Sequence, residues 1–348
     1  MPIALLTRVP SALLLLTLSS AAQQKPAPLS PFVKQDAPLL VLEHVRLIDG
    51  TGAAPQEDMR IDIAGGKIIA VDAAKSRVAY PPNAKVVDLT GKTVIPGLVG
   101  MHEHLFYPTP QRPEGGDNLE HGIAEDTEFY PGKKPGECPP YAKVEESLEN
   151  IDIAGPEVKQ MIHDLVAHQV AITSTLAILE TFVANRPPME RESTALKTLT
   201  LEAAKDYLAR RSIVAQQGAG NKLLALEMRF ERAFVDAGGL LMAGCDPTGY
   251  GGVVPGFGDQ RNVELLVEAG FTPVDAIRIA TLNGARFMGK DAVIGSIAVG
   301  KAADIVVLGA NPAEKIDNMK KVELVFKDGV GYDPDALIQS VSGLVGLR

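Results

Sequence analysis

The sequence predicts an α/β protein in which a β-rich region, assembled from both ends of the chain, accompanies a middle region of alternating strands and helices. Short β-rich runs recur at even spacing near the N-terminus, and similar runs return near the C-terminus. Between them, apolar strand-like segments alternate with helical patterns. The chain has 348 residues, of which 46% are hydrophobic, so it is long enough for one large domain or two smaller ones.

The first 22 residues predict a cleaved signal peptide. Arg8 supplies a positive charge, Ser11 to Leu18 form a short apolar run, and Ala22 ends a stretch of small residues suited to cleavage. The alternatives are an uncleaved membrane anchor and a wrongly chosen start codon, although the run is short for a membrane-spanning helix. We therefore expect an exported protein, periplasmic or secreted, without stable membrane insertion after cleavage. Residues 23–38, rich in proline and polar side chains, are expected to form a linker.

Residues 39–95 and 293–332 together predict a composite β-sandwich. The N-terminal part contains β-rich runs separated by glycine turns such as Gly65-Gly66, and strands are expected over 38–48, 59–63, 67–71, 85–89 and 93–95. The C-terminal part predicts strands over 303–308 and 321–327, followed by the hairpin turn Asp328-Gly329. Residues 333–348 are expected to form a C-terminal tail.

The middle region, residues 96–292, predicts βα units around a parallel sheet. Strand-like apolar segments cover 94–100, 170–179 and 239–245, and helical patterns cover 158–168, 192–211 and 221–237. A further helix begins with Thr272 as N-cap and Pro273 at its first position. His163 and His168 are expected on a solvated helix face.

Charge and cysteine content narrow the range of functions. The formal net charge is −9, there is no dense basic cluster and no tryptophan, so nucleic acid is not an expected partner. The two cysteines, Cys138 and Cys245, do not make a disulfide framework, and one disulfide or two free thiols remain equally open.

His102 and His104 follow the apolar segment 94–100 and are two residues apart. Residues at this spacing on a strand share a face, so the two imidazoles can bind one metal ion. The alternative is a pair of surface histidines on a loop. Histidine makes up only 6 of the 348 residues, and the pair follows an apolar strand closed by Pro96-Gly97. The pattern therefore favours a site for a divalent metal ion, with zinc as the expected metal.

Residues 94–104 resemble the first barrel strand of the metal-dependent amidohydrolase superfamily, and within it the imidazolonepropionase and prolidase-like branch. The runs 45–50 and 300–308 resemble the opening and the return of that family's composite β-sandwich. The resemblance covers almost all of the chain after the linker. It implies a distorted (β/α)8, TIM-like barrel, a β-sandwich, and hydrolysis of C–N bonds with one or two divalent metal ions.

Two further segments resemble family motifs. Residues 119–122 resemble the sixth-strand motif, whose histidine, here His121, binds a second metal or polarises the substrate; the alternative is a lone loop histidine. Residues 242–247 resemble the eighth-strand motif, whose aspartate, here Asp246, lies by the metal and accepts a proton from the attacking water; the alternative is an Asp-Pro turn. The implied metal ligands are His102, His104, His121 and Asp246, and the implied catalytic residues are Asp246 and His121.

The spacing between His104 and His121 departs from the family pattern. The two residues are 17 positions apart, whereas a single βα repeat of a barrel takes about 30 residues. Barrel strands two to five cannot fit between these two histidines. The family's lysine on the fourth strand and histidine on the fifth strand are therefore expected to be absent. We therefore expect an incomplete barrel with an internal deletion whose seam lies near Gly115-Gly116-Asp117. Its open strand edges favour self-association into a homo-oligomer.

These observations lead to three hypotheses. The first is a metal-dependent hydrolase of an amide or peptide bond in a small-molecule or peptide substrate. The second is a truncated, catalytically impaired relative or pseudoenzyme, arising from a natural deletion or a sequence error. The third is a sugar- or peptide-binding β module whose ligand binding would survive replacement of both His102 and His104 by alanine. The resemblance favours the first hypothesis, and the short gap between His104 and His121 favours the second.

Overall fold

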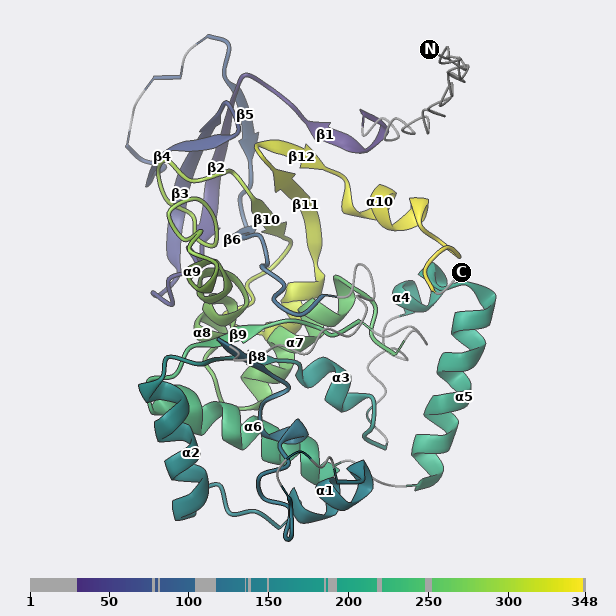
Figure 1. Cartoon of the computed structure of the whole chain (residues 1–348). Helices are drawn as coiled ribbons and strands as arrows, with labels where there is room; N and C mark the ends of the chain where they lie inside the picture. The colour runs from purple at the N-terminus through teal and green to yellow at the C-terminus, as the bar shows by residue number, and fades with distance from the viewer. Residues whose placement is uncertain are drawn as a thin grey trace, which may run out of the picture. The chain divides into compact units, whose positions relative to one another are not determined.

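The computed structural model describes most of the chain from Ser30 onward (Figure 1). The described residues are 30–76, 79–80, 82–103, 117–134, 136, 139–148, 150–184, 186, 193–217, 221–247 and 252–346. The predicted signal peptide, His104, Cys138 and the glycines of the expected seam lie outside them. Phe32 to Arg348 form one compact unit, and the predicted division into a sandwich and a truncated barrel stays a prediction. Each helix in the described part is too short or too polar to span a bilayer.

A nine-stranded mixed sheet contains strands from both ends of the chain (Figure 1). Its order is β1-β12-β11-β10-β6-β2-β3-β4, and β5 also pairs with β2. β6 joins the two ends, because it pairs antiparallel with β10 and parallel with β2. The strands are β1 Val33–Gln35, β2 Leu39–Leu47, β3 Gln56–Ala64, β4 Lys67–Ala73, β5 Lys85–Asp88, β6 Thr93–Pro96, β10 Ile305–Leu308, β11 Val322–Lys327 and β12 Val330–Tyr332.

Two segments expected to be irregular contain regular structure. β1 comes from the predicted linker and pairs with β12, whose outer edge would otherwise carry unpaired backbone groups. The predicted tail contains helix α10, Pro334–Ser340, in which the Asp333 side chain caps the backbone N–H groups of Asp335 and Ala336. Asp333-Pro334 is a helix-start pattern, with an N-cap aspartate followed by proline at the first helical position, so a helix rather than an irregular tail follows it.

A separate sheet of three parallel strands lies in the middle region. Its order is β7-β8-β9, with β7 Asn118–Glu120, β8 Ala171–Ser174 and β9 Leu241–Ala243. The predicted strand over 170–179 was too long, because β8 ends at Ser174 and the buried helix α3, Leu176–Glu180, follows. A short apolar run does not distinguish a buried strand from a buried helix by its periodicity, which explains the difference.

The segment that carries His102 is not a strand, which corrects the predicted strand over residues 94–100. β6 ends at Pro96 inside the large sheet. Beyond it, the chain runs beside the end of β9: the Met101 N–H donates to the carbonyl oxygen of Ala243 at 3.0 Å, and the Asp246 N–H donates to that of His102 at 3.0 Å. Strands β7, β8 and β9 and residues 101–102 therefore lie side by side in that order, and together they form one strand array.

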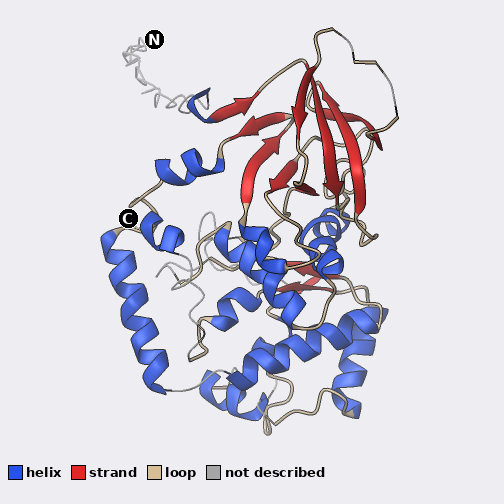
Figure 2. Cartoon of the chain, turned by 180° about the vertical axis from the view of Figure 1, so that it is seen from behind, coloured by secondary structure: helices blue, strands red, loops and turns tan. Residues whose placement is uncertain are grey.

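Helices surround the small sheet (Figure 2). The sequence located several of them: α2 and α6 match two of the helical patterns, and the Thr272 side chain accepts the N–H of Asp275 as the predicted N-cap of α8. The predicted helix over 192–211 is instead divided into α4 and α5. The helices are α1 Tyr141–Leu148, α2 Pro156–Ala167, α4 Ser193–Thr198, α5 Leu201–Gln217, α6 Asn221–Asp236, α7 Phe257–Glu268, α8 Pro273–Arg278 and α9 Gly284–Phe287, with short 3-10 or π segments at Ser30–Phe32, Gly122–Glu125, Ile279–Asn283 and Ile316–Lys320.

Glu231 of α6 is completely buried among the apolar side chains of the middle region. Burial raises the pKa of Glu231 to about 8. The ordinary value is 4.5, so between these pH values the folded protein keeps a proton that the unfolded chain releases. The contribution of this proton to the free energy of unfolding is fully present below pH 4.5. It decreases as the pH rises toward 8, by up to about 1.4 kcal/mol per pH unit.

We expect Glu231→Gln to remove this pH dependence. The glutamine is uncharged at every pH, so the folded state no longer holds an excess proton. Urea unfolding at pH 5, 6.5 and 8 would measure the change, with the exposed Glu202→Gln of α5 as the control that keeps the wild-type slope. An unchanged slope in Glu231→Gln would show that Glu231 is not the group responsible.

Candidate metal centre

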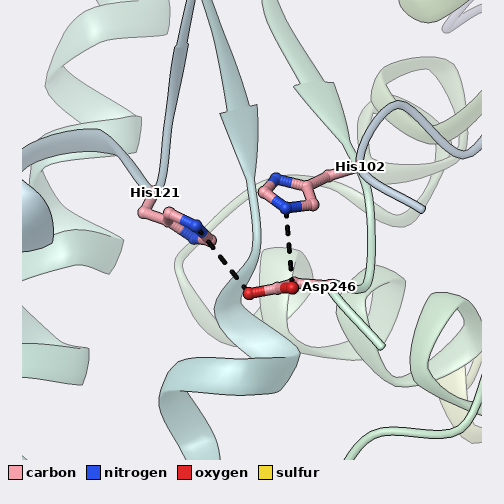
Figure 3. A group of neighbouring side chains, drawn as sticks. All are labelled: His102, His121 and Asp246. Atoms are coloured by element: carbon pink, nitrogen blue, oxygen red, sulfur yellow. Dashed lines mark ion pairs between the residues drawn. The ribbon is translucent and has the colours of Figure 1, made fainter. Parts of the chain in front are cut away.

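Three of the predicted site residues converge at the C-terminal ends of the parallel strands (Figure 3). His102 lies beside the end of β9, His121 follows β7, and Asp246 follows β9. His102 Nε2 is 3.5 Å from Asp246 Oδ1, and His121 Nε2 is 3.8 Å from Asp246 Oδ2. The fourth predicted ligand, His104, lies outside the described residues. The structure thus brings together His102, His121 and Asp246, which are far apart in the sequence.

The backbone explains how these side chains meet. β7 and residues 101–102 lie on opposite sides of β8 and β9, yet the ring centroids of His102 and His121 are only 4.8 Å apart. The array must therefore curve, so that side chains from its two margins meet over its end. His121 and Asp246 both have left-handed backbone conformations, with φ of 64° and 50°. Such conformations are uncommon outside glycine and cluster at functional sites.

The second ring nitrogen of each histidine is occupied by a hydrogen bond. His102 Nδ1 donates to Glu120 Oε2 at 2.5 Å, and the amide of Asn118 holds the other oxygen of this carboxylate. His121 Nδ1 shares a hydrogen bond with Thr175 Oγ1 at 2.7 Å. A carboxylate can only accept, so this bond places the proton of neutral His102 on Nδ1 and makes Nε2 the nitrogen that would coordinate a metal ion. Both Nε2 atoms point toward Asp246 (Figure 3).

The surrounding charges favour a proton on His102. Burial lowers the pKa of His102, but the hydrogen bond to Glu120 and the negative charges of Glu120, Asp246 and Glu103 outweigh burial and raise it. A metal ion coordinates only the neutral imidazole. Metal binding at this position is therefore expected to release a proton.

The donor set fits a divalent metal ion. Two imidazole nitrogens and one carboxylate oxygen are typical zinc ligands, and their donor atoms all lie within 4.8 Å of one another. Ligands at tetrahedral positions around zinc are about 3.4 Å apart when the metal–ligand bonds have their usual length. The separations of 3.5 and 3.8 Å are close to this value and longer than a strong hydrogen bond.

A second acidic cluster lies next to the first. Cys245 is buried and free of any disulfide, and its Sγ lies 3.5 Å from Glu103 Oε2. Burial, followed by repulsion from Asp259, raises the pKa of Glu103 to about 7. Burial and the two neighbouring carboxylates also raise the pKa of the Cys245 thiol. The thiol is therefore kept protonated and unreactive.

Sequence reasoning missed Glu120 and Thr175, which orient the two histidines. Glu120 stands directly before His121, and neighbouring residues of a strand point to opposite faces. Both nevertheless reach the site, because β7 ends at Glu120 and His121 already has a left-handed backbone. The sequence did contain a signal for Thr175, because it lies two residues after Thr173 and is therefore expected on the same face of β8. Using that signal requires knowing which face of β8 points toward the site.

Comparisons with known proteins agree with this architecture. Residues 209–331 match the model of the Amidohydrolase family. Adenine deaminase 2 of Jannaschia sp. (strain CCS1) is 40% identical over 76 residues, which cover 22% of this chain and 12% of that protein. Imidazolonepropionase of Parabacteroides distasonis is 30% identical over 129 residues, which cover 34% and 31% of the two chains. The match thus spans less than a third of either relative.

The fold comparison covers more of the chain. The crystal structure of a putative prolidase from Bifidobacterium longum superposes with a TM-score of 0.53 over 88% of this chain and 98% of that one, at 19% identity. At this identity the likeness concerns the fold alone, which is of the TIM-barrel type. The family match, the sequence relatives and the shared fold agree with one another. Residues 209–331 therefore resemble the Amidohydrolase family, and the chain as a whole shares the fold of the prolidase structure.

Proposed function

We propose that this protein is a metal-dependent hydrolase that cleaves a C–N bond, an amide or peptide bond, in a small substrate. The observation that carries the proposal is the convergence of His102 Nε2, His121 Nε2 and the Asp246 carboxylate at the C-terminal ends of the parallel strands. The match of residues 209–331 to the Amidohydrolase family supports the reaction class. His104 is proposed as a further ligand on the family resemblance, and zinc as the metal, because imidazole and carboxylate suit it.

The residues at the site have different roles in the proposed hydrolysis. A divalent ion bound here supplies a positive charge that polarises a substrate carbonyl and makes a water molecule more acidic. His102 and His121 offer Nε2 atoms whose direction is set by Glu120 and Thr175. The Asp246 carboxylate is the nearest acceptor for a proton from the attacking water, and it can return that proton to the departing nitrogen.

The alternative proposal is a catalytically impaired relative with an incomplete barrel and a composite β-sandwich. It is favoured by the small sheet, in which β7 pairs on one side only within the described residues. The bridging lysine and further histidine of the family pattern have no counterpart between His104 and His121. Such a protein would hold a metal ion weakly and show little turnover.

The decisive experiment compares the wild-type protein with Asp246→Asn. After zinc loading and removal of excess metal, bound zinc is measured by mass spectrometry, and hydrolysis is screened with dipeptides and N-acyl amino acids. We expect about one or two zinc ions per chain and turnover that falls by roughly 10²–10⁴-fold in Asp246→Asn. Asp328→Asn is the matched control, because Asp328 is an exposed aspartate with the same left-handed backbone.

The possible results separate the proposals. Bound zinc without turnover on any tested substrate would support the impaired relative. Absence of zinc in the wild-type protein would contradict both the metal site and the hydrolase. Equal turnover in wild type and Asp246→Asn would exclude Asp246 from the proton transfer.

We expect Glu120→Gln to weaken zinc binding by roughly 10–100-fold, the range found when a residue that orients a metal-binding histidine is replaced. Glutamine can offer its amide nitrogen to His102 Nδ1, so the preferred tautomer is lost although the side-chain shape is kept. Competition with a chromogenic chelator measures the affinity, and nitrogen chemical shifts of the metal-free protein report the tautomer of His102. The control is Glu57→Gln, an exposed carboxylate in β3. Unchanged affinity and tautomer would show that Glu120 has no orienting role.

A further inference from the structure

A cavity of about 580 Å³ lies between helices α2 and α6 and the loop that precedes α2. This volume is within the range of small-molecule sites, about 300–1,000 Å³. Arg229 and Ala233 of α6 line the cavity, whereas Glu227 and Glu231 of the same helix are buried in the protein core. By helical periodicity these two pairs lie on different faces of α6. The cavity is therefore separate from the candidate metal centre.

The floor of the cavity is apolar. Ile162 is buried in the main hydrophobic core, and Ile153, Val166 and Ala233 are partly buried against it. A bound hydrocarbon chain would cover these side chains and remove apolar surface from water, which favours binding. The floor thus suits the apolar part of a ligand.

Positive groups stand at the rim of this floor. Lys159 and His163 are four residues apart on α2, so they share a helix face, and Arg229 faces them from α6. In the part of the chain that the structure describes, neither Lys159 nor Arg229 forms an ion pair. Two cations without partners beside an apolar floor are notable in a protein with a net charge of −9.

The acidic residues of the rim already have partners. Asp236 forms an ion pair with Arg232 one helical turn earlier, at 3.1 Å. Asp152 accepts the backbone N–H of Ala154 at 2.9 Å in the turn before α2. Asp236 is thus paired with a cation, whereas Asp152 keeps its negative charge at the end of the cavity that precedes α2. Among the described residues, Lys159 and Arg229 are the rim cations that form no ion pair.

We propose that this cavity binds a small amphipathic carboxylate, with its hydrocarbon chain on the floor formed by Ile153, Ile162, Val166 and Ala233. The carboxylate lies between Lys159 and Arg229, where a guanidinium and an ammonium can both donate hydrogen bonds to it. His163 adds a third donor at the same rim. The site is independent of the proposed hydrolysis.

Calorimetric titration of the full-length protein with decanoate tests the proposal. We expect saturable binding of one molecule per chain with a Kd on the order of 0.1 mM, as expected for a ligand of about a dozen heavy atoms. The double variant Lys159→Gln/Arg229→Gln should weaken binding by about tenfold or more. Decanol, which has the same chain without the charge, and decyltrimethylammonium, which has the opposite charge, should bind more weakly than decanoate.

Matched variants keep the test decisive. Lys205→Gln/Lys290→Gln removes two exposed positive charges elsewhere and should leave decanoate binding unchanged. Ala233→Phe fills the floor and should abolish binding without lowering the melting temperature. The proposal is overturned if decanoate does not saturate the wild-type protein. It is equally overturned if decyltrimethylammonium binds as tightly as decanoate, or if Lys159→Gln/Arg229→Gln and Lys205→Gln/Lys290→Gln bind it alike.

Discussion

Replacing His102 by alanine is expected to lower the affinity for zinc by more than about 100-fold, beyond the effect of losing an orienting residue. His102 contributes Nε2 at 3.5 Å from Asp246 Oδ1, and its Nδ1 is held by Glu120, so its direction is set before a metal ion arrives. Without the imidazole, His121 and Asp246 remain as the only described ligands. Isothermal titration with zinc measures the affinity directly and requires no substrate.

The control for this prediction is His168→Ala. His168 is exposed just after α2 and is not part of the group that converges at the strand ends. Zinc binding that is equally strong in wild type, His102→Ala and His168→Ala would show that zinc binds elsewhere.

Replacing Gly244 by alanine is expected to destabilise the protein by roughly 2–3 kcal/mol, the upper part of the usual range for overpacking. A Cβ atom at Gly244 would lie 2.3 Å from the backbone nitrogen of His102 and 2.6 Å from its Cβ. These atoms cannot rotate away, because the hydrogen bonds of Met101 and Asp246 flank the contact. Urea unfolding measures the free-energy change, and zinc titration shows whether His102 has been displaced.

Gly97→Ala is the matched control for Gly244→Ala. A Cβ atom at Gly97 would lie 3.6 Å from the nearest atom, the carbonyl oxygen of Asp304, which is an ordinary contact. The same chemical change should therefore alter stability by less than about 0.5 kcal/mol. If the two substitutions had the same effect, the close approach of β9 to the His102 segment would not be the cause.

Much of the fold could be predicted where a local pattern decides it. The glycine turn at Gly65-Gly66 joins β3 and β4, and Thr272 caps α8, because both depend on neighbouring residues alone. The ends of elements were less accessible. β6 ends at Pro96, where Pro96-Gly97 already signalled a break, and β8 ends at Ser174, although further apolar residues follow both points and led the predicted strands to extend too far.

The sequence by itself determined which residue types could build the site. The spacing of His102 and His104 after an apolar segment predicted a metal site from the residues alone, and the family resemblance added His121 and Asp246. The resemblance then assigned a chemical role to each. The short gap between His104 and His121, from which the incomplete barrel was predicted, likewise follows from counting residues in the sequence.

Only the tertiary structure decided how these residues meet and what supports them. Side chains from the two margins of the array, 18 and more residues apart along the chain, touch because the array curves, and no local pattern encodes that curvature. Glu120 and Thr175 became orienting residues through the same packing, and the cations beside the α2–α6 cavity face one another only once those helices are in place. A site of this kind depends on distances between distant segments, and those distances are determined by the packing of the whole core.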